Sequence, residues 1–185
     1  EKLSAGEILQ IEKSMTKSMD EDTYFDMIGQ KTASLIATSC ELGAITTTKK
    51  GSDRKSTFDF GHNLGMAFQI KDDLFDIIGS ESETGKNGNS DVKKNMITLP
   101  LIYSRTQMTR SQKRHLNRLL SAKRKTKNIL SKIQELVEET GGIQYSIDKM
   151  KEYSDLALKA ISHYPDTLIK TSLTNLVEYN GSRKK

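Results

Sequence analysis

The sequence contains no tryptophan, two prolines and a single cysteine, and aromatic residues make up 6% of its 185 positions. With one thiol, Cys40, no intrachain disulfide can form, which fits a reducing compartment and predicts a cytoplasmic protein. No apolar run approaches the roughly 18 residues that a membrane-spanning helix requires, so stable membrane insertion is not expected. No segment alternates apolar and polar residues with a period of two, so strands are not expected either.

Charge permits an anionic partner but does not by itself indicate one. Charged residues make up 29% of the chain, the formal net charge is +5 and the pI is about 9.1. The basic residues are spread along helical segments with acidic residues between them, and the densest basic run, residues 113–127, has no interleaved aromatics. We therefore interpret that run as a solvated helix face and expect no nucleic-acid partner.

Apolar residues recur at helical spacing along most of the chain. The predicted helices cover residues 3–19, 22 or 23–46, 56 or 57–79, 98–108, 111–122, 126–140, 143–162 and 166–179. This pattern predicts an all-α fold in which antiparallel helices surround a central cavity. With no internal repeat and no interdomain linker, residues 1–185 are expected to belong to a single domain.

The helix boundaries rest on capping residues and breaker-rich segments. Asp22 or Thr23 is expected to cap the second helix, and Ser56 or Thr57 the third. Two segments between helices, 49–55 and 80–91, are expected to be polar loops. The second of these directly follows the third helix, so it could fold over a functional site.

The third predicted helix carries three aspartates within an otherwise apolar segment, GHNLGMAFQIKDDLFDIIG at residues 61–79. Steps of four, three and four from Gly65 place Gln69, Asp72 and Asp76 on one face, with Asp73 next to them. Because apolar residues flank this stripe, we expect the carboxylates to point into a lined cavity rather than to form an ordinary acidic patch. Close carboxylates repel one another and are costly to desolvate, and oxygen-only ligands suit Mg²⁺.

Two lysines accompany the aspartates. Lys31, followed by Thr32, interrupts a helix that is otherwise apolar or small, so its ammonium group either reaches solvent or meets an anion inside. Lys86 follows Gly85 in a predicted loop, where a lysine is ordinarily exposed. Lysines together with carboxylate-held Mg²⁺ are what a diphosphate needs, since both neutralise its charge.

These residues belong to an ordered series of motifs. The series is GEILQ at 6–10, KTASL at 31–35, ELGA at 41–44, GxxFQxxDDxxD at 65–76, Gly85–Lys86, Asp91 and TLP at 98–100. In this series the chain resembles the trans-type polyprenyl diphosphate synthases, the polyprenyl synthetases that include farnesyl diphosphate synthases. The resemblance implies an isoprenoid-synthase-type helical bundle, usually a homodimer. It also implies Mg²⁺-dependent condensation of isopentenyl diphosphate onto an allylic diphosphate.

The resemblance also implies roles for individual residues. Asp72 and Asp76, supported by Asp73, would form the family's second metal-binding motif. The contacts to the allylic diphosphate would come from four polar side chains: Lys31, Thr32, Gln69 and Lys86. Of all these residues, Asp72, Asp76 and Lys31 are expected to act in catalysis, and the departing diphosphate rather than a side chain would accept the proton.

Two departures from the family pattern limit the activity that is expected of this chain. The family's first aspartate-rich motif and its arginine pair lie upstream of GEILQ, and residues 1–185 do not contain them. We therefore expect the chain to be the C-terminal part of a synthase, lacking the N-terminal helices and inactive alone. Asn95 and Met96 stand where many members have glycine and lysine, with Lys93 or Lys94 as possible substitutes. The alternative is a non-catalytic helical subunit that pairs with or regulates an active synthase, whereas KTASL and TLP disfavour a terpene cyclase.

Overall fold

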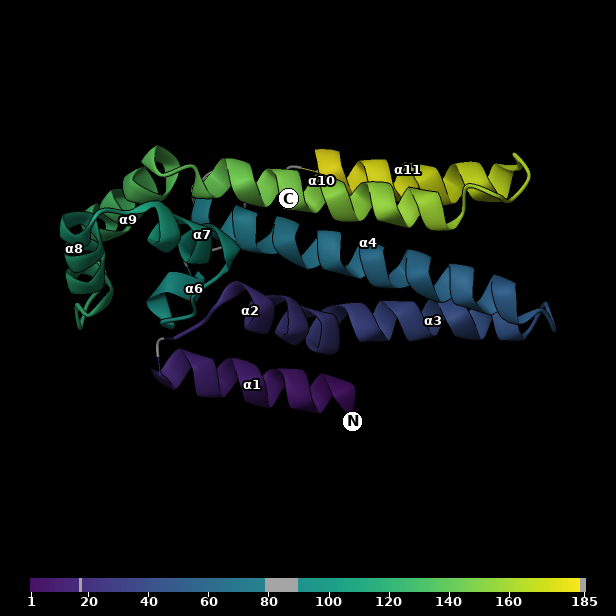
Figure 1. The fold of residues 1–185 in the computed structure, drawn as a ribbon, viewed down its shortest axis with the longest axis horizontal. Helices are drawn as coiled ribbons and strands as arrows, with labels where there is room; N and C mark the ends of the chain where they lie inside the picture. Colours follow the sequence, from purple (N-terminus) through teal and green to yellow (C-terminus); the bar gives the residue numbers. More distant parts are fainter. Residues whose placement is uncertain (17, 79–89, 184–185) are drawn as a thin grey trace.

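A computed structural model of the chain describes residues 1–16, 18–78 and 90–183. Every regular element within these ranges is a helix, which confirms the predicted all-α fold (Figure 1). None of the described helices is both long and apolar enough to cross a membrane.

The helices of the first 45 residues lie along one side of the bundle (Figure 1). They are α1 (Lys2–Thr16), α2 (Glu21–Ile28), the π-helix η1 (Gly29–Ala33) and α3 (Ser34–Ile45). The capping residue of α2 is Asp20 and not Asp22 or Thr23, because the extended backbone of Asp20 lets its carboxylate accept a hydrogen bond from the Thr23 amide at 2.8 Å. From α2 the chain runs through η1 into α3 as one continuous helical segment, as predicted.

Helix α4 (Gly51–Ile78) is the axis of the fold, and its 28 residues span about 42 Å. It packs against α3 on one side and α10 on the other (Figure 1). The predicted start at Ser56 or Thr57, after a loop over 49–55, was wrong. Thr48 accepts a hydrogen bond from the Lys50 amide and donates one to Asp53, so the turn that opens the helix lies before Gly51.

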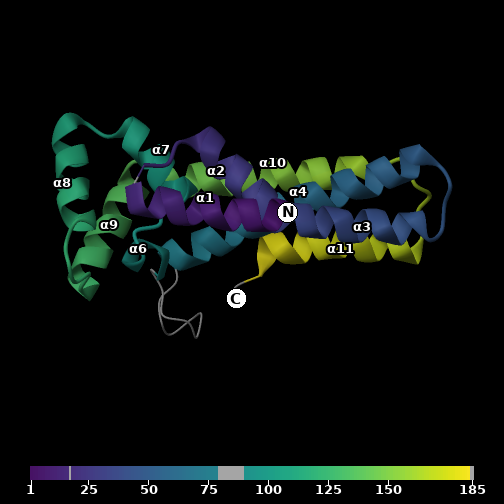
Figure 2. The same ribbon diagram turned by 90° about the horizontal axis from the view of Figure 1, so that it is seen from below.

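The C-terminal half returns along α4. Its elements are α6 (Ser90–Lys93), α7 (Leu99–Gln107), α8 (Arg110–Leu120), α9 (Lys127–Glu139), α10 (Gly142–Ala160) and α11 (Leu168–Ser182). Helices α8 and α9 gather at one end of the bundle, whereas α10 and α11 run beside α4 (Figures 1 and 2). Of the predicted loop 80–91, Ser90 and Asp91 belong to α6 and the rest lies outside the described residues.

Two glycines let helices approach closely next to the aspartates. A Cβ on Gly65 of α4 would lie 2.6 Å from the Cα of Ala33 in η1. A Cβ on Gly6 of α1 would lie 2.6 Å from the backbone nitrogen of Lys31. No side chain fits at such distances, so these glycines bring α1, η1 and α4 into contact at one place.

Candidate active site

Lys31 lies in the π-helical turn η1. The Ser34 amide donates to the carbonyl of Gly29, five residues earlier, and such widened turns are frequent at functional sites. The Lys31 ammonium donates to Gln10 Oε1 at 2.7 Å and lies 3.3 Å from Glu7 Oε1. Both partners belong to α1, which Gly6 holds against η1. The ammonium group is therefore held by polar partners on α1 at a partly exposed place, instead of extending freely into solvent.

A chain of hydrogen bonds crosses from η1 to α4 and on to α2. The Thr32 hydroxyl donates to Gln69 Oε1 at 2.7 Å, and Gln69 Nε2 donates to Asp73 Oδ1 at 2.9 Å. The buried hydroxyl of Tyr24 donates to Asp73 Oδ2 at 2.7 Å. Both oxygens of the Asp73 carboxylate are thus fixed by side chains from other turns.

Asp73 is 5% exposed, and its burial raises the pKa of its carboxyl group to about 7, with the charge of Asp91 as the next cause. Its hydrogen bonds from Gln69 and Tyr24 act in the opposite direction. Burial, followed by the charge of Asp76, raises the pKa of Asp91 to about 6, whereas Lys94 and Lys31 lower it. Negative charge at this place is therefore only partly compensated by the protein itself.

The other two aspartates of the motif have different partners. Asp72 Oδ1 accepts a hydrogen bond from Arg183 Nη2 at 2.5 Å, and Asp76 Oδ2 accepts one from the Asp91 amide at 2.9 Å. The Arg183 guanidinium also lies over the rings of Phe68 and Phe75. In the part of the chain that the structure describes, no three His, Cys, Asp or Glu side chains converge closely enough to hold a metal ion.

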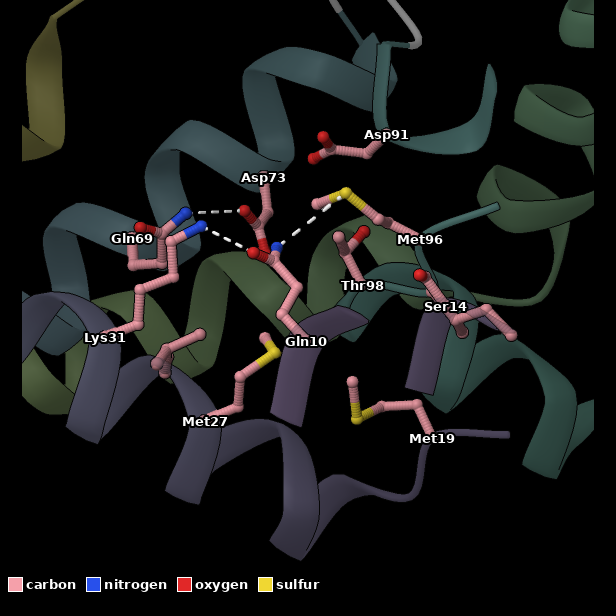
Figure 3. A pocket seen from close by; sticks show the side chains of 12 residues that line it. Gln10, Ser14, Met19, Met27, Lys31, Gln69, Asp73, Asp91, Met96 and Thr98 are labelled. Carbon is pink, nitrogen blue, oxygen red and sulfur yellow. Dashed lines mark hydrogen bonds between the residues drawn. The ribbon is translucent and has the colours of Figure 1, made fainter. Parts of the chain in front are cut away.

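A cavity of about 110 Å³ lies between Lys31, Gln69 and Asp73 (Figure 3). The polar side chains that line it come from α1, η1, α4, α6 and the approach to α7: Gln10, Ser14, Lys31, Gln69, Asp73, Asp91 and Thr98. Asp73 thus faces the cavity, although the predicted stripe ran through Asp72 and Asp76. The face of α4 that packs on η1 and α2 follows steps of four, from Gly65 to Gln69 and then Asp73.

Comparison with known proteins gives the family of this chain. The family model for polyprenyl synthetase matches residues 1–139. The chain belongs to the polyprenyl synthetase family. It is 31% identical over 185 residues to geranylgeranyl diphosphate synthase of Saccharolobus solfataricus, covering 99% of this chain and 55% of that relative. It is 32% identical over 180 residues to heptaprenyl diphosphate synthase component 2 of Bacillus subtilis, covering 97% of this chain and 50% of that relative.

Solved structures show the same fold. Polyprenyl synthase from Caulobacter crescentus, crystallised with calcium and isoprenyl diphosphate, superposes with a TM-score of 0.92 at 27% identity. That match covers 100% of this chain and 56% of the other. This polyprenyl synthetase chain thus spans about half the length of the relatives that it matches.

The donor chemistry of this polyprenyl synthetase chain fits the divalent cation that the family implies. Asp73 and Asp91 have raised pKa values, and a neighbouring carboxylate contributes to each shift. A hard cation with oxygen ligands would relieve that charge. Asp73 and Asp91 face the cavity. All three motif aspartates would have to share or exchange their present hydrogen bonds to hold the metal.

Of the predicted site residues, Lys86 lies outside the described residues. Several other site residues of this polyprenyl synthetase chain were missed by sequence reasoning. Tyr24 counted only as an apolar helix position, although it lies two turns before Lys31. Gln10 was part of a quoted motif without a role, and its spacing of three from Glu7 was the available signal. Met96 lines the cavity where a lysine was expected, and the Gln10 amide donates to its sulfur at 3.8 Å.

Proposed function

We propose that this chain forms the allylic diphosphate site of a polyprenyl diphosphate synthase, which condenses isopentenyl diphosphate onto an allylic diphosphate. One observation carries the proposal. The Lys31 ammonium, the hydrogen-bonded side chain of Gln69 and the carboxylates of Asp73 and Asp91 face a single cavity. A cation next to metal-type oxygen ligands suits a metal-bound diphosphate rather than a neutral ligand.

The residues of the chain have separate tasks in this proposal. Lys31, oriented by Glu7 and Gln10, neutralises charge that develops on the departing diphosphate. Thr32 and Gln69 hold the position of the diphosphate, and Lys86 is a further proposed contact. The proposed metal ligands are the motif aspartates Asp72, Asp73 and Asp76. When bound, Mg²⁺ supplies charge neutralisation on the phosphate oxygens.

Lys31→Met tests this assignment because it removes the charge while keeping a long side chain. We expect Mg²⁺-dependent binding of inorganic diphosphate, measured by titration calorimetry, to weaken by roughly 10- to 100-fold, since a charge-assisted contact is worth about 1.5–3 kcal/mol. The matched control is Lys151→Met on the exposed side of α10, which should leave the affinity unchanged. Equal diphosphate affinity in Lys31→Met and in the wild type would contradict the proposal.

Catalysis is proposed to need more than this chain. Residues 1–185 contain one aspartate-rich motif, and the relatives are about twice as long. We expect no incorporation of isopentenyl diphosphate by the chain alone, and incorporation once a polypeptide carrying the first motif completes the site. A non-catalytic subunit is the second candidate function, favoured by the Bacillus subtilis relative whose name makes it one component of a synthase. An upstream DDxxD in the same polypeptide would argue against this second candidate.

A cytoplasmic homodimer is part of the same proposal. Apolar side chains that are exposed on α1 and α3 support association with further protein: Ile8, Ile11, Met15, Leu35 and Leu42. Light scattering on the full-length protein should give twice the mass of one chain, and a monomer would refute the dimer.

Arg183 is expected to compete with the metal. Its guanidinium side chain is 11% exposed and holds Asp72 by a charge-assisted hydrogen bond. We expect Arg183→Ala to raise the affinity for Mg²⁺ alone by about three- to tenfold, because a partly exposed ion pair is worth about 1 kcal/mol. Calorimetry at low ionic strength measures this change, and Lys149→Ala, which removes the pair with Glu152, is the control. Weaker Mg²⁺ binding in Arg183→Ala would show that Arg183 and Mg²⁺ do not compete for Asp72.

A further inference from the structure

The net positive charge of the chain arises from one short stretch. Residues 110–127 contain eight of the 29 Lys and Arg residues and no Asp or Glu. The remaining chain has 21 Lys and Arg against 24 Asp and Glu residues, so it is net acidic without this stretch. The sequence pattern alone suggested a solvated face, but the structure shows how the charges are arranged.

Helix α8 separates its charges from its apolar residues. Leu116, Leu119 and Leu120 are buried. Arg110, Arg114 and Arg118 lie four residues apart on the side facing away from these leucines, and all three are exposed. We call the exposed cations of α8 its basic face: Arg110, Lys113, Arg114 and Arg118. Two more exposed cations, Lys123 and Arg124, follow in the segment after the helix. The helix lies at one end of the bundle and runs across its long axis (Figures 1 and 2).

The basic face is electrostatically unfavourable for the isolated helix. Like charges four residues apart repel each other, and a cation at Arg110 opposes the positive end of the helix dipole. The capping residue Thr109 and the buried leucines, not the charges, therefore hold α8 in place. An anionic partner would relieve this repulsion.

The surroundings of the basic face narrow the class of partner. Residues 104–144 contain no Phe, Tyr or Trp, so the face lacks the aromatic platforms on which single-stranded nucleic acid stacks. Among described residues from 90 to 155, no large hydrophobic side chain is exposed, so the face lacks the apolar anchors of a typical protein interface. A bilayer with anionic headgroups requires neither, because it attracts clustered Lys and Arg by charge alone.

We propose that the basic face of α8 docks on the surface of a bilayer that contains anionic phospholipid. The choice of a bilayer over duplex nucleic acid rests on the proposed function, since a polyprenyl diphosphate carries an apolar chain that partitions into lipid. Docking would place the enzyme where its product leaves the water phase. The contact is peripheral and electrostatic, so it involves no inserted segment.

Vesicle co-sedimentation tests this docking with the full-length protein. The vesicles contain phosphatidylcholine and phosphatidylserine at about 70:30, which gives the surface a negative potential, or phosphatidylcholine alone. We expect binding to the mixed vesicles at low salt, little binding to the neutral ones, and at least a tenfold loss when salt is raised to about 0.5 M. Binding to both kinds of vesicle alike, or to neither, would overturn the proposal.

Two variants of α8 locate the contact. The triple reversal Arg110→Glu, Arg114→Glu and Arg118→Glu should weaken vesicle binding at least tenfold, and the neutral triple replacement by glutamine should have a smaller effect in the same direction. The matched control is a charge reversal of equal size at exposed lysines elsewhere: Lys132→Glu, Lys151→Glu and Lys159→Glu. Circular dichroism checks that each variant is folded. Equal losses in the control and in the α8 variants would overturn the proposal.

Two further measurements separate this inference from the proposed function. Tighter binding to duplex DNA than to mixed vesicles would overturn the choice of a bilayer. Diphosphate binding by the α8 variants should equal that of the wild type, since the basic face is not part of the cavity lining. Loss of vesicle binding with intact diphosphate binding therefore concerns the docking face alone, and failure of diphosphate binding in the wild type concerns the active site.

Discussion

Asp73→Asn is expected to raise the melting temperature of the metal-free protein at pH 8 and to abolish its response to Mg²⁺. The wild-type carboxylate is buried, and its pKa of about 7 leaves it largely ionised at pH 8. An ionised carboxylate inside a protein costs on the order of several kcal/mol unless it is fully paired. Its hydrogen bonds from Tyr24 and Gln69 offset only part of this cost. A net gain of about 1–2 kcal/mol corresponds to roughly 2–8 °C for a chain of this size.

The pH dependence of stability gives the same prediction a second readout. The unfolded chain loses the Asp73 proton near pH 4, whereas the folded protein keeps it until about pH 7. Between these values the folded state binds more protons, so the free energy of unfolding falls as pH rises through this window. Thermal melts from pH 4 to pH 8 should show this fall in the wild type and a smaller one in Asp73→Asn. Asp155→Asn, at an exposed position on α10, should behave like the wild type.

Added Mg²⁺ with diphosphate should reverse the order of stability. A ligand that binds only the folded state stabilises it by mass action, and the variant has lost a proposed ligand. The wild type should then melt higher than Asp73→Asn at pH 8. Equal stabilisation of both proteins by Mg²⁺ and diphosphate would show that Asp73 does not take part in metal binding.

Gly65→Ala is expected to damage both folding and the site. Its Cβ would lie 2.6 Å from the Cα of Ala33, and a backbone atom cannot move aside as a flexible side chain can. Overpacking of this kind costs about 1–3 kcal/mol, which lowers the melting temperature by roughly 2–12 °C. Because η1 must move away from α4, the hydrogen bond between Thr32 and Gln69 is lost. Diphosphate affinity, measured by calorimetry, should fall at least tenfold.

Gly43→Ala is the control for this prediction. Gly43 lies within α3 and a Cβ there would meet no atom within 4 Å. Alanine is better than glycine inside a helix by about 1 kcal/mol, so this variant should melt higher by roughly 2–4 °C and keep its diphosphate affinity. If Gly65→Ala behaved in the same way, the close approach of α4 and η1 would not be required.

Helix content and most helix positions could be predicted because they depend on local periodicity. Apolar spacing located eight helical segments, and Thr98 with Pro100 correctly marked the beginning of α7. The beginning of α4 was predicted about five residues late, because polar residues 51–55 look alike in a loop and in an exposed helix turn. The turn that places Gly51 in the helix depends on hydrogen bonds of the Thr48 hydroxyl. The spacing of apolar residues carries no information about such bonds.

The composition of the site was accessible from motifs, but its arrangement was not. Lys31, Thr32, Gln69 and the three aspartates were all named from spacing and resemblance. Which aspartate faces the cavity depends on the face of α4 that contacts η1. Gly65 makes this contact, and steps of four along the helix from Gly65 lead to Gln69 and Asp73. Pattern reasoning instead followed the apolar flanks and chose the stripe through Asp72 and Asp76.

Short-range information therefore suffices for the helices, the charge imbalance of residues 110–127 and the chemical inventory of the site. Each of these is a property of neighbouring residues, or of a motif that can be read along the chain. Packing decides the rest: the orientation of Lys31 towards α1, the burial of Asp73 against Tyr24 and the pairing of Asp72 with Arg183. These contacts join residues 21 to 111 positions apart, so they exist only once the helices are assembled.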